Sequence, residues 1–142
     1  MAVSSQPFSM RLAPATLGRL DRQARNRGET KTRVGERLLE EGLRMADHPS
    51  IVFRDGPTGR RAALAGGPDV WEVIGTLQSG DEKGEMAIAA IVEMGVVTRP
   101  QVEAALRYYG DYPDEIDSRI RRNLETADRE YAAWRRAQDA LA

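Results

Sequence analysis

The feature that most constrains this chain is a short segment near its start in which side chains alternate between apolar and polar. In PFSMRLA, residues 7–13, one face holds Phe8, Met10 and Leu12, and the other holds Pro7, Ser9 and Arg11. A strand this short is not stable by itself, because its apolar face and its backbone groups need a partner. We therefore predict that it pairs with the same strand of a second copy, which makes the protein a homodimer.

A first amphipathic helix is predicted to follow the strand. Pro14 suits the first turn of a helix, and Gly28 permits the left-handed backbone that ends one. Between them Leu17, Leu20 and Ala24 recur at three- and four-residue steps, so they share one face.

A second helix is predicted to begin at a threonine and to run through Leu43. Thr30 and Thr32 are both competent N-caps. The free backbone N–H groups of its first turn lie beside Lys31 and Arg33. Unpaired N–H groups and cations at a helix start form an arrangement that binds phosphate.

The run SMRLAPATLGRLDRQARNRGETKTRVGERLLEEGLR, residues 9–44, closely resembles the ribbon-helix-helix family of repressors and antitoxins, of the MetJ/Arc/CopG type. Its parts occur in the family's order: the strand, RL-x-P, the leucine-rich helix, the glycine turn, the Thr-x-Thr cap and the second helix. The resemblance implies that two strands pair antiparallel across a two-fold axis and enter the DNA major groove as a ribbon. It also implies that Ser9 and Arg11 face base edges, with Pro7 at the outer end of the ribbon.

Two positions depart from the family pattern. Pro7 stands where many relatives carry a polar reader, and Ala13 stands where a capping Asp or Ser is common. Base reading then depends mainly on Arg11, whose bidentate contact to guanine is worth about 1–3 kcal/mol of discrimination. The alternative is that Arg11 is only solvated or pairs with an acid. The predicted DNA-binding residues are Pro7, Ser9, Arg11, Thr30, Lys31, Thr32 and Arg33.

Charge separates the two ends of the chain. The net charge of −1 combines +4 for residues 1–46 with −5 for the remainder. A positive patch, doubled in a dimer, attracts phosphates, whereas the acidic remainder suits a protein partner. The absence of cysteine, and of a long apolar run of the kind that crosses membranes, favours a cytoplasmic protein with no membrane partner.

Residues 47–50 are predicted to be a linker, because polar residues and a proline interrupt the helical pattern there. Residues 51–112 then form a small helical domain that begins with a β-hairpin, in which DGPTG at 55–59 is the turn. Helices are predicted from Pro68 or Asp69 to Leu77, from about Glu85 to Gly95, and from Thr98 onward.

This middle region is similar to a second family, the small helix-turn-helix-like antitoxin domains found beside PIN-type ribonuclease toxins. The matching stretches are FRDGPTGRRAALAGGPDVWEVI and GVVTRPQVEAALRYYGDYPDEID. The resemblance implies a partner-binding platform or an accessory DNA-binding element. Arg60 and Arg61 are expected either to contact phosphates or, more commonly for such a pair, to be simply exposed.

Residues 113–142 are predicted to form one long amphipathic helix. Its apolar residues follow three-, four- and seven-residue steps: Ile116, Ile120, Leu124, Ala127, Tyr131, Trp134 and Leu141. The stripe packs on its own domain, or it binds a partner through aromatic anchors. Under the second interpretation the partner-binding residues are Ile120, Leu124, Tyr131 and Trp134.

Catalysis has little support in the sequence. The one histidine, His48, precedes a proline in the linker and is expected to be solvated. The glycines of DGPTG and AGG lack the Lys-Ser/Thr of a phosphate-binding loop. The carboxylates around Asp114 lie in a helix start with no base or nucleophile nearby, where capping explains them better. We therefore predict no enzyme, no catalytic residue, no metal and no cofactor.

The sequence thus predicts a mainly α protein: a dimeric ribbon-helix-helix domain at 1–46, a linker, the small domain and the long helix. The function expected from the resemblances is a DNA-binding antitoxin that represses its own operon and neutralises a toxin, most plausibly a PIN-type ribonuclease. One alternative is a free-standing ribbon-helix-helix transcriptional regulator whose C-terminal domain oligomerises or senses a ligand. Another is a purely structural interaction protein that binds no operator.

Overall fold

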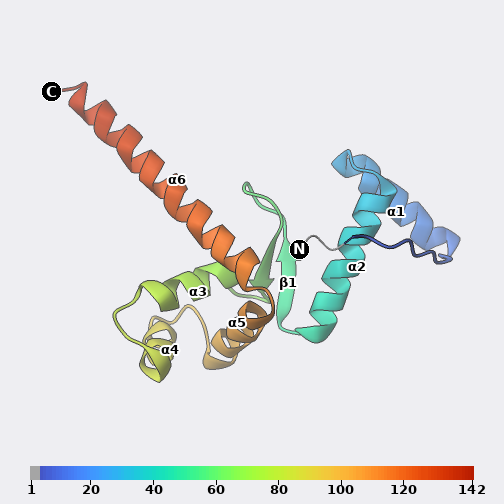
Figure 1. Ribbon diagram of the computed structural model, residues 1–142, viewed down its shortest axis with the longest axis horizontal. Coiled ribbons are helices and arrows are strands. Elements are labelled where there is room, and N and C mark those ends of the chain that lie inside the picture. Colours follow the sequence, from blue (N-terminus) through green and yellow to red (C-terminus); the bar gives the residue numbers. More distant parts are fainter. Residues whose placement is uncertain (1–3) are drawn as a thin grey trace. The chain divides into compact units, whose positions relative to one another are not determined.

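The computed structural model describes residues 4–142 and is mainly helical, which confirms the mainly α part of the predicted fold class (Figure 1). The described residues contain six helices and one two-stranded sheet. In chain order the elements are α1 (Pro14–Arg27), α2 (Lys31–Asp47), β1 (Ile51–Arg54), β2 (Arg61–Leu64), α3 (Val70–Ser79), α4 (Gly84–Glu93), α5 (Arg99–Asp111) and α6 (Pro113–Asp139).

The chain divides into two compact units, Met1–Leu43 and Arg44–Ala142, here called the first and second units. The division falls inside α2, ahead of the boundary expected at residue 46. Helix α2 continues to Asp47, and His48 is only 9% exposed. The prediction of a solvated His48 is therefore wrong, because this side chain packs into the second unit.

The first unit contains the two predicted helices. Pro14 opens α1, and Gly28 ends it in the left-handed conformation with φ of 64°. Residues 4–13 carry no regular secondary structure in the single chain. Since the hydrogen bonds of a strand come from its neighbour, the expected strand at residues 7–13 stays a prediction about a dimer.

The second unit begins with the predicted hairpin. Strands β1 and β2 pair antiparallel, with Ile51 opposite Leu64 and Phe53 opposite Ala62. Arg54 fastens the strand ends to the following loop, because its Nη2 donates to the carbonyl oxygens of Leu64 at 2.6 Å and Gly67 at 2.7 Å.

Helices α3 and α5 start where the sequence predicts, and local hydrogen bonds explain why. At α3 the carboxylate of Glu72 accepts the backbone N–H of Asp69 at 2.9 Å. At α5 Thr98 and Gln101 form a reciprocal capping box, in which each side chain accepts the other's backbone N–H, at 3.3 and 2.9 Å.

One apolar core holds the second unit together. It joins the hairpin to α3, α4, α5 and the first turns of α6. Its most completely buried large side chains are Ile51, Leu64, Val70, Val73, Ile74, Val102 and Tyr108. Full burial of a side chain of this size contributes about 1.5–3 kcal/mol, so a core of this extent supports an independently folded unit.

Helix α6 is anchored only at its start. Ile116 is buried and Ile120 packs against the core. Arg119 donates to Thr58 Oγ1 at 2.8 Å and to the carbonyl of Arg60 at 3.2 Å, which ties the helix to the hairpin turn. Every residue from 121 to 142 is exposed. Figure 1 shows the rest of the helix extending away from the body of its unit.

No helix in the described part of the chain combines the length and the apolar character that a membrane crossing needs.

The packing of the core leads to a testable prediction at Tyr108, whose side chain is completely buried. Its hydroxyl accepts from Arg44 Nη1 at 2.8 Å and donates to Glu115 at 2.7 Å. Tyr108→Phe should lower the free energy of unfolding of the second unit by about 1–2 kcal/mol, because the hydrogen bonds that the hydroxyl of this buried side chain makes to Arg44 and Glu115 are lost. Urea titration followed by tryptophan fluorescence measures this, since Trp71 and Trp134 both lie in that unit.

The matched control is Tyr109→Phe, which removes a hydroxyl bonded to Asp117 at 2.8 Å on a partly exposed residue. It should change the free energy of unfolding by less than about 0.5 kcal/mol. Equal losses in the two variants would contradict the role given to the buried network.

Candidate nucleic-acid and partner interfaces

The seven predicted DNA-binding residues all lie in the first unit, and all are exposed. Ser9 and Arg11 belong to the segment without regular structure. Within residues 4–142 no ion pair reaches Arg11, so its guanidinium is available to a ligand. The alternative expectation, that Arg11 pairs with an acid, finds no such acid in the described chain.

The start of α2 shows which threonine caps the helix. Thr30 Oγ1 accepts the backbone N–H of Arg33 at 3.1 Å, whereas Thr32 lies inside the helix. The backbone N–H groups of Lys31 and Thr32 belong to the first turn, where intrahelical acceptors are lacking. The helix start therefore offers exposed donors beside cationic side chains, which is a phosphate-binding geometry.

Acidic side chains of the first unit partly neutralise the positive charge at the start of α2. Lys31 Nζ lies 3.3 Å from Asp21 Oδ1, and Arg33 Nε lies 3.7 Å from a Glu29 oxygen. The side chain of Arg33 is nevertheless 80% exposed and that of Lys31 is 55% exposed. Exposed pairs of this kind are worth about 0–1 kcal/mol, so a phosphate can compete for both cations.

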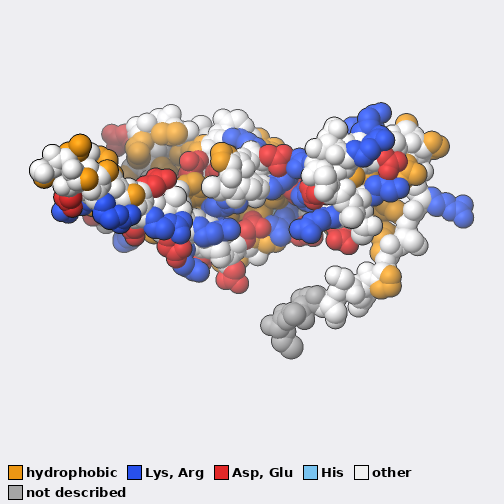
Figure 2. Space-filling view, turned by 90° about the horizontal axis from the view of Figure 1, so that it is seen from above, with side chains coloured by type: hydrophobic (Ala, Val, Ile, Leu, Met, Phe, Trp, Pro, Cys, Tyr) orange, Lys and Arg blue, Asp and Glu red, His pale blue; other side chains and the backbone are white. Residues whose placement is uncertain are grey.

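The first unit also exposes much apolar surface. Its only buried apolar side chains among the described residues are Ala24 and Val34. Larger ones lie at the surface, including Leu39 at 49% and Leu43 at 59% exposure. Figure 2 shows hydrophobic and basic side chains next to one another over the part of the molecule that contains α1 and α2. The exposed set is Phe8, Met10, Leu12, Leu17, Leu38, Leu39 and Leu43.

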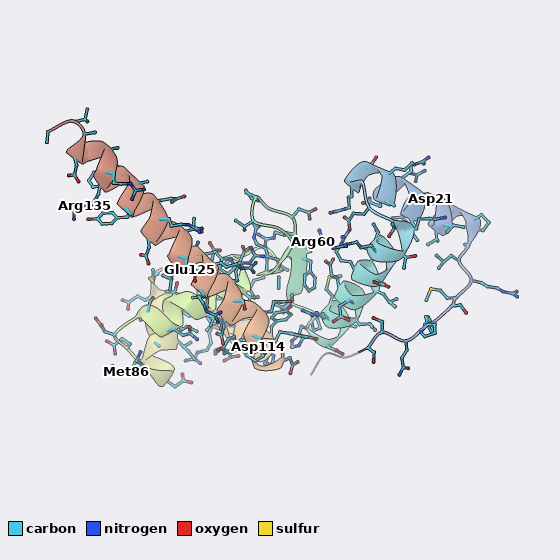
Figure 3. All side chains as sticks on the ribbon, turned by 45° about the horizontal axis from the view of Figure 1, so that its top comes forward. Asp21, Arg60, Met86, Asp114, Glu125 and Arg135 are labelled. Atoms are coloured by element: carbon cyan, nitrogen blue, oxygen red, sulfur yellow. The ribbon has the colours of Figure 1, made fainter. Side chains whose placement is uncertain are left out.

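In the second unit the predicted stripe on α6 divides into two parts. Ile116 and Ile120 pack on their own unit, whereas Leu124 is 60%, Tyr131 59% and Trp134 57% exposed. The rings of Tyr131 and Trp134 stack with centroids 5.9 Å apart. Figure 3 shows no other element of the second unit beside α6 around Arg135. The exposed part of the stripe is called the α6 seam; it comprises Leu124, Ala127, Tyr131 and Trp134 on the helix and Leu141 just after the helix end at Asp139.

A shallow groove lies where α6 leaves the core. It runs between α3 and α6, has a volume of about 540 Å³ and is lined by Trp71, Gly75, Thr76, Ile120 and Leu124, among others. Of the four predicted partner-binding residues, Ile120 and Leu124 line this groove, while Tyr131 and Trp134 lie farther along the helix.

Arg60 and Arg61 are used inside their own unit. Arg60 lies 3.3 Å from Asp55, and Arg61 pairs with the buried Asp69, which also accepts from the indole of Trp71 at 3.1 Å. Both arginine side chains are about one quarter exposed, at 26% and 23%. The expectation of two simply exposed arginines is therefore wrong, because the hairpin brings acids next to them.

A polar cluster that the sequence did not reveal surrounds Tyr108. His48 Nε2 lies 2.8 Å from Asp111, and Arg44 donates to Glu115 at 2.9 Å while its guanidinium stacks over Tyr112. Burial raises the pKa of the Tyr108 hydroxyl, and the neighbouring Glu115 adds to this. The carboxylates of this region thus pair with specific side chains, a role beyond the capping that was expected.

Comparison of the chain with protein-family models, with curated proteins and with solved structures gives no match. Function must therefore be argued from the residues. Among residues 4–142 no group of three or more His, Cys, Asp and Glu side chains is arranged to hold a metal ion.

The capping geometry at the start of α2 leads to a testable prediction. Thr30→Ala removes the acceptor for the N–H of Arg33 and should destabilise the first unit by about 1 kcal/mol. Thr32→Ala is the matched control, since Thr32 caps nothing and alanine favours a helix. Thermal unfolding monitored by circular dichroism compares the two. A Thr32→Ala protein that loses as much stability as Thr30→Ala would contradict this assignment.

Proposed function

We propose that the protein is a homodimeric DNA-binding repressor of the ribbon-helix-helix type and that it acts in the cytoplasm as the antitoxin of a toxin–antitoxin pair. The observation that carries the first part is the exposed apolar surface of the first unit. The resemblance of residues 9–44 to that family supplies the DNA-binding arrangement.

The dimer follows from the balance of buried and exposed apolar surface. Domains of about 40 residues rarely fold alone without disulfides, metals or oligomerisation, and this chain has no cysteine. Among the described residues of the first unit only two apolar side chains are buried, while leucines on α2 stay half exposed. A second copy would cover them, and each leucine fully removed from water contributes about 1.5–3 kcal/mol.

The same dimer would create the DNA-binding surface. Pairing of the two N-terminal segments through Phe8, Met10 and Leu12 turns Ser9 and Arg11 outward. Thr30, Lys31, Thr32 and Arg33 at the start of α2 would then hold phosphates on either side. The charge of +4 on residues 1–46 is doubled in the dimer, which supports attraction to double-stranded DNA.

The antitoxin part of the proposal places the toxin on the second unit. This unit is acidic and presents the exposed Leu124, Tyr131 and Trp134 on α6. Amphipathic helices with aromatic anchors insert into apolar grooves of partner proteins. The similarity of residues 53–117 to antitoxin domains found beside PIN-type ribonucleases supports such a toxin as the partner.

A second candidate function is a free-standing transcriptional regulator whose second unit senses a ligand. The groove between α3 and α6 favours it, because a volume of about 540 Å³ is within the range of small-molecule sites. This candidate shares the DNA-binding dimer and differs only in what the second unit binds.

DNA binding is tested with Arg11→Ala in a gel shift on the DNA upstream of the gene. Loss of a bidentate base contact should weaken binding by at least about tenfold and reduce the preference over unrelated DNA. Arg129→Ala, on the exposed part of α6, is the matched control and should bind like wild type. Unchanged affinity and selectivity of the Arg11→Ala protein would remove Arg11 as the reader.

Toxin binding is tested by co-purification with the product of the adjacent gene. Truncating an aromatic anchor at an interface costs about 2 kcal/mol or more, so Trp134→Ala should weaken the complex by at least about 30-fold. Arg136→Ala, on the same helix but outside the α6 seam, should leave it intact. A complex that tolerates both changes would contradict this placement of the toxin.

A further inference from the structure

The C-terminal part of α6 lacks a supporting surface. From residue 121 to Asp139 it is continuous helix, and every side chain is exposed. In proteins most helical stability comes from the packing of an amphipathic face, and this part of α6 has no such packing within its own unit. The aromatic rings of Tyr131 and Trp134, 59% and 57% exposed, identify the face that needs covering.

The spacing along that face points to another helix as the cover. Within α6, Leu124, Ala127, Tyr131 and Trp134 fall on the alternating three- and four-residue steps of a heptad repeat. Gln138 takes the fifth position, and Leu141 follows just after the helix end at Asp139. This spacing keeps one stripe facing a second helix along a coiled coil. Arg122, Arg129 and Arg136 recur every seven residues on the opposite side, where their charges stay solvated.

The charges beside the α6 seam make it self-complementary. Asp128, Glu130 and Arg135 occupy the flanking heptad positions. In a parallel pair of helices Glu130 of one copy faces Arg135 of the other. In an antiparallel pair Asp128 faces Arg135. The described residues give neither Glu130 nor Arg135 an ion pair within the chain, so Arg135, labelled in Figure 3, is free to pair across copies.

We propose that in the free protein the α6 seam is covered by the same seam of a second copy, as a short two-stranded coiled coil. The inference rests on the homodimer of the proposed function, because a dimer joined elsewhere raises the local concentration of one helix around the other to roughly millimolar. A toxin that uses Tyr131 and Trp134 must then displace the second copy, which makes self-pairing a competitor of toxin binding.

Cysteine cross-linking of the full chain tests this cleanly, because the natural sequence has no cysteine. Ala127→Cys places a thiol in the α6 seam, and Ala133→Cys places one on the exposed outer face as the control. Parallel pairing predicts that Ala127→Cys forms disulfide-linked dimers at least about tenfold faster than Ala133→Cys. Antiparallel pairing predicts fast cross-linking only when Ala127→Cys is combined with Gln138→Cys. Either result supports the proposal.

A second pair of variants tests the charges. Arg135→Glu, made in the cross-linking background, should slow disulfide formation. Compensation by Glu130→Arg is expected for parallel helices, and compensation by Asp128→Arg for antiparallel ones. Cross-linking in the seam that is no faster than at Ala133→Cys, in protein whose mass is that of a dimer, overturns the coiled coil and leaves the proposed function standing.

A monomeric mass at the same concentration overturns the homodimer and the coiled coil together. Co-expression with the product of the adjacent gene is the last part of the test. If the seam cysteine is shielded from a thiol reagent only in that complex and never cross-links without it, the toxin is the occupant and the second copy is not.

Discussion

The rest of the proposed architecture depends on apolar surface that one copy of the first unit cannot bury. Among the described apolar side chains of the first unit, only Ala24 and Val34 are buried. The leucines of α2 and the apolar residues at 8, 10 and 12 are exposed. Because the hydrophobic effect scales with the area removed from water, the unit gains most from a second surface of the same kind. In the proposed dimer, the association of two copies and the outward display of Ser9 and Arg11 would both be consequences of a single burial event.

The second unit buries its apolar side chains within a single copy of the chain. Its hairpin, α3, α4, α5 and the start of α6 share one core around Tyr108, and Arg54 and Arg119 donate to specific acceptors within the unit. Stability there does not require a partner, which leaves the exposed half of α6 free to bind one. The division of charge, positive in residues 1–46 and negative beyond, is consistent with the proposed separation between a nucleic-acid partner and a protein partner.

Features fixed by neighbouring residues could be predicted from the sequence. Pro14, Gly28, Thr98 and the DGPTG turn act locally, so the helix ends and the hairpin follow from them. The environments of His48, Arg60 and Arg61 could not be predicted, because their partners are set by how the chain folds back: Asp111 is 63 residues away from His48. The predicted N-terminal strand belongs to a third kind, since its proposed partner is a second copy of the chain and its hydrogen bonds would lie between copies.

Hydrogen exchange at the backbone amides of residues 8–12, measured on the full chain over a range of concentrations, tests the central claim most directly. Pairing of two copies predicts slow exchange in the dimer that becomes fast on dilution, as the strands separate. Fast exchange at every concentration, in protein whose helices remain folded, would contradict the paired strands and with them the DNA-binding surface.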